Sequence, residues 1–167
     1  LENLFRKNLK SNRLNFTNEY SNNISESDVI FICVGTPPKK NGESNLSFVD
    51  QVSKEISNKI KGYTVIVSKS TVPVGTSKRV EKVLKKNNSI KSFDVVSNPE
   101  FLREGAALED FSRPDKIIIG CRTMKAEKIL KKIYKTLKRP FVVTNNETAE
   151  IIKYANNSFL ATKITFI

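Results

Sequence analysis

The chain of 167 residues contains no histidine and no tryptophan, one methionine and only two cysteines. Cys33 and Cys121 have no candidate metal ligands near them in the sequence, so we expect no metal site. Each cysteine lies in a separate apolar run, which predicts that both are reduced and buried. Metal chemistry is therefore not indicated.

Long apolar runs are also absent. No stretch approaches the roughly 18 residues that a membrane span requires, and the N-terminus shows no signal-peptide pattern. Hydrophobic residues make up 38% of the chain and charged residues 28%, which at this length fits one globular domain with a substantial core. We therefore expect a cytoplasmic protein with no membrane partner.

Glycine is scarce, and the six glycines never form a G-x-G-x-x-G turn, so the usual phosphate-cradling loop is missing. The chain begins at Leu1 rather than at a methionine, and it stops at Ile167 inside an apolar-periodic segment without a C-cap signal. These features predict a piece of a longer protein.

Acidic residues are outnumbered, with 29 Lys and Arg against 17 Asp and Glu and a net charge of +12. This excess raises the possibility of an RNA- or DNA-binding module, which would bind generic nucleic acid in a salt-sensitive way. Most lysines, however, fall on the polar faces of predicted helices, for example within residues 78–86 and 125–135. A solvated basic surface and no nucleic-acid partner are the preferred interpretation.

Apolar strands alternate with amphipathic helices along most of the chain. Strands are predicted at residues 28–34, 63–67, 93–96, 116–119 and 141–144, after a short amphipathic segment and a polar passage that fill residues 1–27. Helices are predicted at about 45–61, at about Val80–Leu84, at about Ile129–Leu137 and from about Glu147, with buried positions that include Phe48, Val49, Val52, Ile56, Ile60 and Ile133. The pattern predicts an α/β fold with a doubly wound parallel sheet, its first strand covered on both faces.

The stretch from Phe93 to Gly105 places a helix signal directly after a strand. Asn98 and Pro99 resemble an N-cap and a first helical position, which predicts a helix beginning there. Glu100 and Glu104 would then share one face near the positive end of that helix. The spacing is compatible both with ordinary helix-start residues and with functional carboxylates.

Three polar turns follow three of the predicted strands. They are Gly35-Thr36-Pro37, Ser70-Thr71-Val72 and Asn98-Pro99-Glu100. In open α/β sheets ligands bind outside the carboxyl ends of the strands, so we expect the three turns to meet at one edge.

Five segments, in order, resemble the UDP-glucose 6-dehydrogenase family over nearly all of the chain after about residue 10. They are Val-Gly-Thr-Pro at 34–37, Ser-Thr-Val-Pro-Val-Gly-Thr at 70–76, Ser-Asn-Pro-Glu-Phe-Leu-Arg-Glu-Gly at 97–105, Arg-Pro-Asp-Lys-Ile-Ile-Ile-Gly at 113–120 and Glu-Ile-Ile-Lys-Tyr-Ala-Asn-Asn-Ser-Phe-Leu-Ala at 150–161. The resemblance implies NAD as cofactor, UDP-glucose as substrate and a homodimer. It also implies oxidation of the C6 alcohol to a carboxylate in two steps, through a thioester on a cysteine.

The resemblance also implies roles for individual residues. The residues expected to contact NAD are Val34, Gly35, Thr36, Pro37, Pro38, Ser70, Thr71, Val72 and Glu104. Those expected to contact the substrate are Glu100, Phe101, Leu102, Arg103, Glu104, Lys153 and Asn157. The resemblance implies that the Thr71 hydroxyl holds a catalytic water, Glu100 acts as general acid and base, and Lys153 and Asn157 share a developing oxyanion.

The resemblance divides the chain into the remainder of a NAD-binding Rossmann-like domain, residues 1–146, and the start of a long central, dimerising helix, residues 147–167. The apolar face of this helix, with Ile152, Phe159 and Ile164, is expected to be exposed. The family's nucleophilic cysteine belongs to a Gly-rich motif that does not occur here, and neither cysteine of this chain has that context. We therefore expect the isolated chain neither to turn over substrate nor to bind NAD tightly.

Two further alternatives remain open at this point. One is a sibling dehydrogenase that acts on GDP-mannose or on a UDP-N-acetylhexosamine. The other is a noncatalytic protein that binds only a nucleotide or a partner.

Overall fold

The computed structural model describes residues 1–19, 22–86 and 92–167, so Tyr20 and Ser21 of the predicted polar passage lie outside the described residues. One sheet contains the strands β1 (Val29–Ile32), β2 (Thr64–Ser68), β3 (Phe93–Ser97), β4 (Ile117–Gly120) and β5 (Phe141–Thr144) in that order. The α-helices are α1 (Glu2–Lys10), α2 (Ser47–Lys59), α3 (Thr76–Lys85), α4 (Ala107–Ser112), α5 (Met124–Tyr134) and α6 (Asn146–Phe166), and two short 3-10 helices are η1 (Asn22–Glu26) and η2 (Lys135–Leu137). The predicted alternation of strands and helices is confirmed.

The sheet is parallel except at one junction. β1 pairs with β2, β2 with β3 and β4 with β5 in parallel, whereas β3 and β4 are antiparallel and meet at Ser97 and Gly120. A parallel crossover needs a helix that packs on the sheet, but the connection after β3 contains only α4, which has six residues and none buried. The predicted α/β fold is confirmed, and the sheet differs from the predicted all-parallel arrangement only between β3 and β4.

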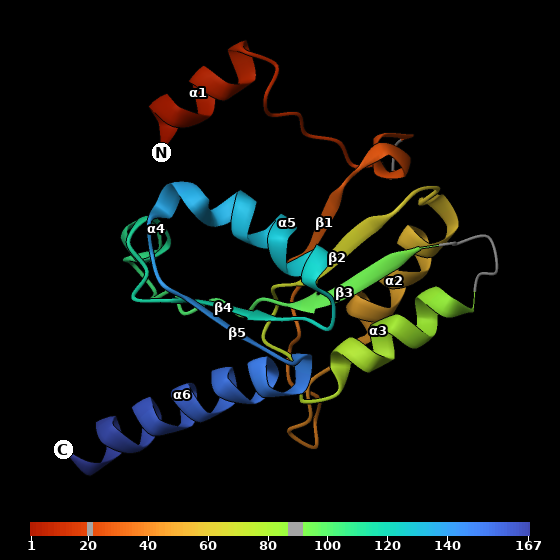
Figure 1. Ribbon diagram of the computed structural model, residues 1–167. Coiled ribbons are helices and arrows are strands. Elements are labelled where there is room, and N and C mark those ends of the chain that lie inside the picture. The colour runs from red at the N-terminus through yellow and green to blue at the C-terminus, as the bar shows by residue number, and fades with distance from the viewer. Residues whose placement is uncertain (20–21, 87–91) are drawn as a thin grey trace.

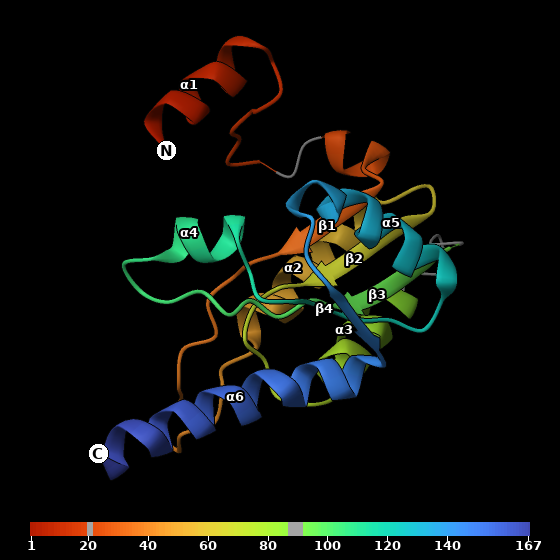
Figure 2. The same ribbon diagram turned by 60° about the vertical axis from the view of Figure 1, so that its left-hand side comes forward.

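Helices cover the two faces of the sheet (Figures 1 and 2), with α2 and α3 on one face and α5 on the other. β2 contributes alternate side chains to both layers, because neighbouring residues of a strand point to opposite faces. Ile66 joins the buried cluster beneath α2 and α3, and Val65 and Val67 join the cluster beneath α5. β2 is therefore buried on both faces, as is usual for a strand inside a parallel sheet.

Several predictions about burial are wrong. β1 is an edge strand rather than a strand covered on both faces, and its Phe31 is 36% exposed. For the same reason Cys33, which follows β1, is exposed rather than buried. Cys121, which follows β4, is only partly buried, and both cysteines are free thiols. Phe48 and Ile133 are 49% and 42% exposed, because each lies at the rim of its helix's apolar stripe.

The two terminal helices extend away from the sheet. In both views α1 stands apart from the body of the molecule, and it has no buried residue. The C-terminal half of α6 projects past the sheet, and Phe159 and Ile164 on it are 64% and 77% exposed, as predicted. Ile152, which was also expected to be exposed, is partly buried. Within the described residues, no helix has the length and apolar character needed to cross a membrane.

Candidate active site

The turns that follow β1, β2 and β3 are joined by hydrogen bonds. The Thr36 hydroxyl donates to the Thr71 carbonyl at 2.8 Å, and the Ser70 hydroxyl donates to the Val34 carbonyl at 2.6 Å. The Asn98 backbone amide donates to the Ser68 carbonyl at 2.9 Å. The predicted meeting of the three turns at one edge of the sheet is confirmed.

The turn after β3 does not begin a helix, so that prediction is wrong. The Asn98 side chain is buried and is used for cross-links, with Nδ2 donating to the Ile118 carbonyl at 2.7 Å. Its Oδ1 accepts from the Tyr134 hydroxyl at 2.5 Å and from the Lys69 ammonium at 3.2 Å. These bonds tie β3 to β4 and α5, and Asn98 is no longer free to cap a helix. Glu100 and Glu104 therefore do not share a helical face.

Glu100 is paired with Lys153 across the site. Lys153 Nζ lies 3.2 Å from Glu100 Oε1, and Glu100 Oε2 accepts from the Leu102 backbone amide at 2.6 Å. The Lys153 side chain is 8% exposed and the Glu100 side chain 29%, so the carboxylate is the more accessible partner. The same ammonium lies 5.1 Å from the centre of the Phe101 ring. α6 and the turn after β3 thus meet at a charged pair.

Three other residues expected to bind substrate or cofactor do not bond to the Glu100–Lys153 pair. Asn157 lies one helical turn beyond Lys153 and is exposed, and Glu104 is exposed in the loop before α4. Arg103 is held by Asp110, with Nη2 2.7 Å from Oδ1 and its backbone amide 2.8 Å from Oδ2. In the part of the chain that the structure describes, neither Asn157 nor Glu104 contacts Glu100 through a hydrogen bond.

Lys69 is a site residue that sequence reasoning missed. Burial lowers the pKa of its ammonium, and the charge of Lys153 lowers it further, while Cys33 and Glu100 act in the opposite direction. Although Cys33 is exposed as a residue, desolvation raises the pKa of its thiol and outweighs the nearby charge of Lys69, which disfavours the thiolate that a nucleophile requires. Its position in the sequence, between a buried strand and a hydroxyl-bearing turn, could have indicated that Lys69 belongs to the site.

A cleft of about 560 Å³ opens beside the charged pair. Its lining includes Lys69, Glu100, Phe101, Arg103, Asn156 and Leu160. This volume suits a small organic ligand, and cationic, anionic and aromatic groups are all available to orient it. The described residues include no group of His, Cys, Asp and Glu side chains that could hold a metal ion.

The turns after β1 and β2 fit part of a dinucleotide. Their hydroxyls and backbone groups lie at the carboxyl ends of parallel strands, where open α/β sheets bind nucleotides. The Thr36 and Ser70 hydroxyls are occupied in joining the turns. The partly buried Thr71 hydroxyl makes no hydrogen bond to any described residue, so it can accept or donate one to a ligand.

Tyr134, which donates to Asn98, gives the site a pH-dependent component. Burial raises the pKa of its phenol to about 12. Because folding favours the neutral phenol, its contribution to stability is complete below the unfolded value of about 10 and is lost as the pH rises toward 12. Urea unfolding at a series of alkaline pH values should show this loss. Tyr134→Phe should make the loss smaller, while the share of Tyr63, whose pKa burial also raises, should remain. The same loss of stability in the wild type and in Tyr134→Phe would contradict the prediction.

A sheet edge with hydroxyl-bearing turns, beside a carboxylate–lysine pair and a small-molecule cleft, is the arrangement with which open α/β folds bind a nucleotide next to reactive side chains. The sequence profile described as "UDP-glucose/GDP-mannose dehydrogenase family, NAD binding domain" matches residues 1–138. The chain belongs to this family.

Known relatives are similar over the whole chain. A UDP-glucose 6-dehydrogenase of Rhizobium meliloti is 47% identical over 100% of this chain and 40% of its own length. The structure of a UDP-glucose dehydrogenase from Pyrobaculum islandicum superposes with a TM-score of 0.93 at 38% identity, over 99% of this chain and 39% of the other. A GDP-mannose dehydrogenase from Pseudomonas aeruginosa gives a TM-score of 0.94 at 36% identity, over the same shares. The chain therefore spans about two fifths of the length of these relatives.

Proposed function

We propose that the intact gene product oxidises UDP-glucose to UDP-glucuronate in the cytoplasm, and that this chain supplies its NAD-binding region and one wall of its active site. The observation that carries the proposal is the contact between Glu100 and Lys153, because two family motifs far apart in the sequence meet there at 3.2 Å. The 47% identity to a protein named UDP-glucose 6-dehydrogenase supports the choice of sugar nucleotide.

Nine residues are proposed to contact the cofactor. They are Val34, Gly35, Thr36, Pro37, Pro38, Ser70, Thr71, Val72 and Glu104. When bound, NAD supplies the hydride acceptor for both oxidations. The Thr71 hydroxyl, which has no hydrogen-bond partner among the described residues, would hold a water close to the substrate.

Two further groups on this chain would act on the substrate carbon. The Lys153 ammonium, with the Asn157 amide one turn further along α6, would donate hydrogen bonds to the oxygen as negative charge develops on it. Glu100 would move the proton of the water that hydrolyses the thioester, and residues 101–104 would bind the sugar nucleotide. The nucleophilic cysteine would lie outside residues 1–167, because Cys33 and Cys121 have the wrong surroundings.

The proposal extends to assembly. Residues 147–167 would be the start of the central helix, with residues 1–146 as the NAD-binding domain before it. Phe159 and Ile164 are 64% and 77% exposed and would be buried between two copies of the intact protein. Analytical ultracentrifugation of the intact protein tests this: a monomer would contradict it.

A sibling activity is the second candidate. The GDP-mannose dehydrogenase of Pseudomonas aeruginosa superposes as well as the UDP-glucose enzyme does, so the fold does not separate the two substrates.

Assay of the purified intact protein tests the proposal. We expect NADH to form with UDP-glucose at two molecules per sugar, and much more slowly with GDP-mannose or UDP-N-acetylmannosamine. Preference for either alternative sugar would select the sibling function, and no NADH from any of the three would contradict a dehydrogenase. Residues 1–167 alone should show no turnover and no tight NAD binding, and turnover by them would overturn the placing of the nucleophile elsewhere.

A further inference from the structure

The buried face of α6 carries polar side chains. Asn146, Glu150 and Lys153 are 2%, 2% and 6% exposed, and their spacing of four and three residues places them on one side of the helix. Each reaches a different part of the site. Asn146 Nδ2 donates to the Val95 carbonyl of β3 at 3.0 Å, and its Oδ1 accepts from the Ser97 amide at 3.3 Å. Lys153 pairs with Glu100.

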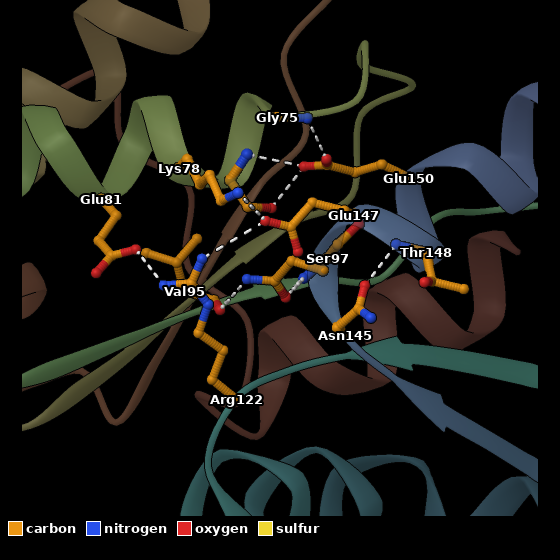
Figure 3. A network of polar contacts seen from close by, with 12 residues as sticks. Gly75, Lys78, Glu81, Val95, Ser97, Arg122, Asn145, Glu147, Thr148 and Glu150 are labelled. Atoms are coloured by element: carbon orange, nitrogen blue, oxygen red, sulfur yellow. Dashed lines mark hydrogen bonds and ion pairs between the residues drawn. The ribbon is translucent and has the colours of Figure 1, made fainter.

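Glu150 binds the N-terminus of α3 (Figure 3). Its Oε2 accepts from the Gly75 amide at 2.6 Å, and its Oε1 accepts from the Ser77 amide at 2.8 Å and the Ser77 hydroxyl at 2.7 Å. Gly75 occupies the N-cap position with φ +94° and has no side chain to offer. Another helix therefore provides the acceptor that the first free amides of α3 need. Three donors and the positive end of α3 make this buried carboxylate favourable.

The bond joins two parts of the proposed active site. Gly75 ends the turn that contains Thr71, and Glu150 lies one helical turn before Lys153. A shift of α6 relative to α3 would therefore change how Lys153 approaches Glu100, because the helix moves as a rigid element. We propose that Glu150 is a positioning residue, which fixes the register of α6 so that Lys153 and the Thr71 turn face the same substrate; this rests on the proposed function.

Glu147 offers a matched control. It lies three residues before Glu150 on α6 and also reaches α3, with Lys78 Nζ at 2.9 Å, and Arg122 Nη2 lies 3.6 Å away (Figure 3). Its side chain is 29% exposed, so its ion pairs are solvated and weak. Glu147→Gln removes the same charge from the same helix and leaves the cap on α3 intact.

The first test is steady-state kinetics of the intact protein, well below each variant's unfolding midpoint. In Glu150→Gln an amide donor would face the Gly75 amide, so we expect the link to open and kcat to fall about tenfold to a hundredfold, with KM for the sugar nucleotide changed less than threefold. Glu147→Gln should stay within about twofold of the wild type. Ser77→Ala should lower kcat less than Glu150→Gln, and the double variant should be no worse than Glu150→Gln alone, since both changes break one link. A lower unfolding midpoint with unchanged kcat would overturn the proposal.

The second test does not depend on activity. Hydrogen exchange of the intact protein should be faster in Glu150→Gln at two separate peptides, one covering residues 70–77 and one covering residues 98–103, while β2 stays protected. Glu147→Gln should leave both peptides unchanged. Faster exchange at 70–77 alone would show a local cap without coupling and would overturn the positioning role. If both peptides exchanged faster but the intact protein oxidised no sugar nucleotide, the positioning by Glu150 would stand and the proposed function would be refuted.

Discussion

Replacing Lys153 with methionine is expected to lower kcat of the intact protein by about a hundredfold to a thousandfold, the loss typical of removing one oxyanion donor. Methionine keeps most of the buried stem while removing the ammonium and its contact with the Phe101 ring. The protein should remain folded, because the Glu100 carboxylate left without its partner is 29% exposed and can be solvated. Initial rates with saturating UDP-glucose and NAD measure the effect.

Lys78→Met is the control for this experiment. The Lys78 side chain is 64% exposed and is paired with the partly exposed Glu147 carboxylate, so its loss should change kcat less than twofold. Equal activity of the Lys153 and Lys78 variants would remove Lys153 from the proposed mechanism.

Gly120→Ala is expected to destabilise the fold by about 3 kcal/mol, through overpacking against the first residues of α6. A Cβ at this position would lie 2.5 Å from the Ala149 Cβ, 2.8 Å from the Asn145 carbonyl oxygen and 2.9 Å from the Asn146 Cα. These atoms belong to the start of α6, so the helix must shift as a unit. Urea unfolding measures the loss, and the activity of the folded protein should fall with it because Lys153 lies on the same helix.

Gly62→Ala provides the comparison for this change. A Cβ added at Gly62 meets no atom within 4 Å, and we expect a change in unfolding free energy of no more than about 0.5 kcal/mol. If the two alanine variants unfolded at the same urea concentration, the close contact between β4 and α6 would be refuted.

The strands and most helices were predictable because their signals are local. Unbroken apolar runs such as residues 63–67 and the 3.6-residue periodicity of 45–61 do not depend on distant partners. The antiparallel junction of β3 with β4 was not predictable, because connection length alone does not reveal whether a chain crosses over or turns back. The helix predicted to begin at Asn98 was wrong for a related reason. The N-cap signal of Asn98 is local, but its partners Ile118 and Tyr134 are far away in the sequence.

The candidate site was predictable only in part. Nothing in the local sequence distinguishes Lys153 from an ordinary surface lysine, and only the family resemblance placed it with Glu100 among the substrate-binding residues. Glu150 belongs to the last matching motif, but the sequence predicted no role for it, because its partners Gly75 and Ser77 are 75 and 73 residues away. Polar residues on the buried face of α6 also interrupt the apolar periodicity by which buried helix faces are recognised.

The single antiparallel junction between β3 and β4 has a mechanical consequence. Ser97 and Gly120 form the one ladder pair across it, whereas the neighbouring strands share four or five. A force that pulls β1–β3 away from β4 and β5 would therefore act mainly on the junction between β3 and β4. α6 connects the two sides of this junction, because Asn146 bonds to β3 and the start of the helix packs against Gly120 of β4. The helix that carries Lys153 would therefore resist much of that force.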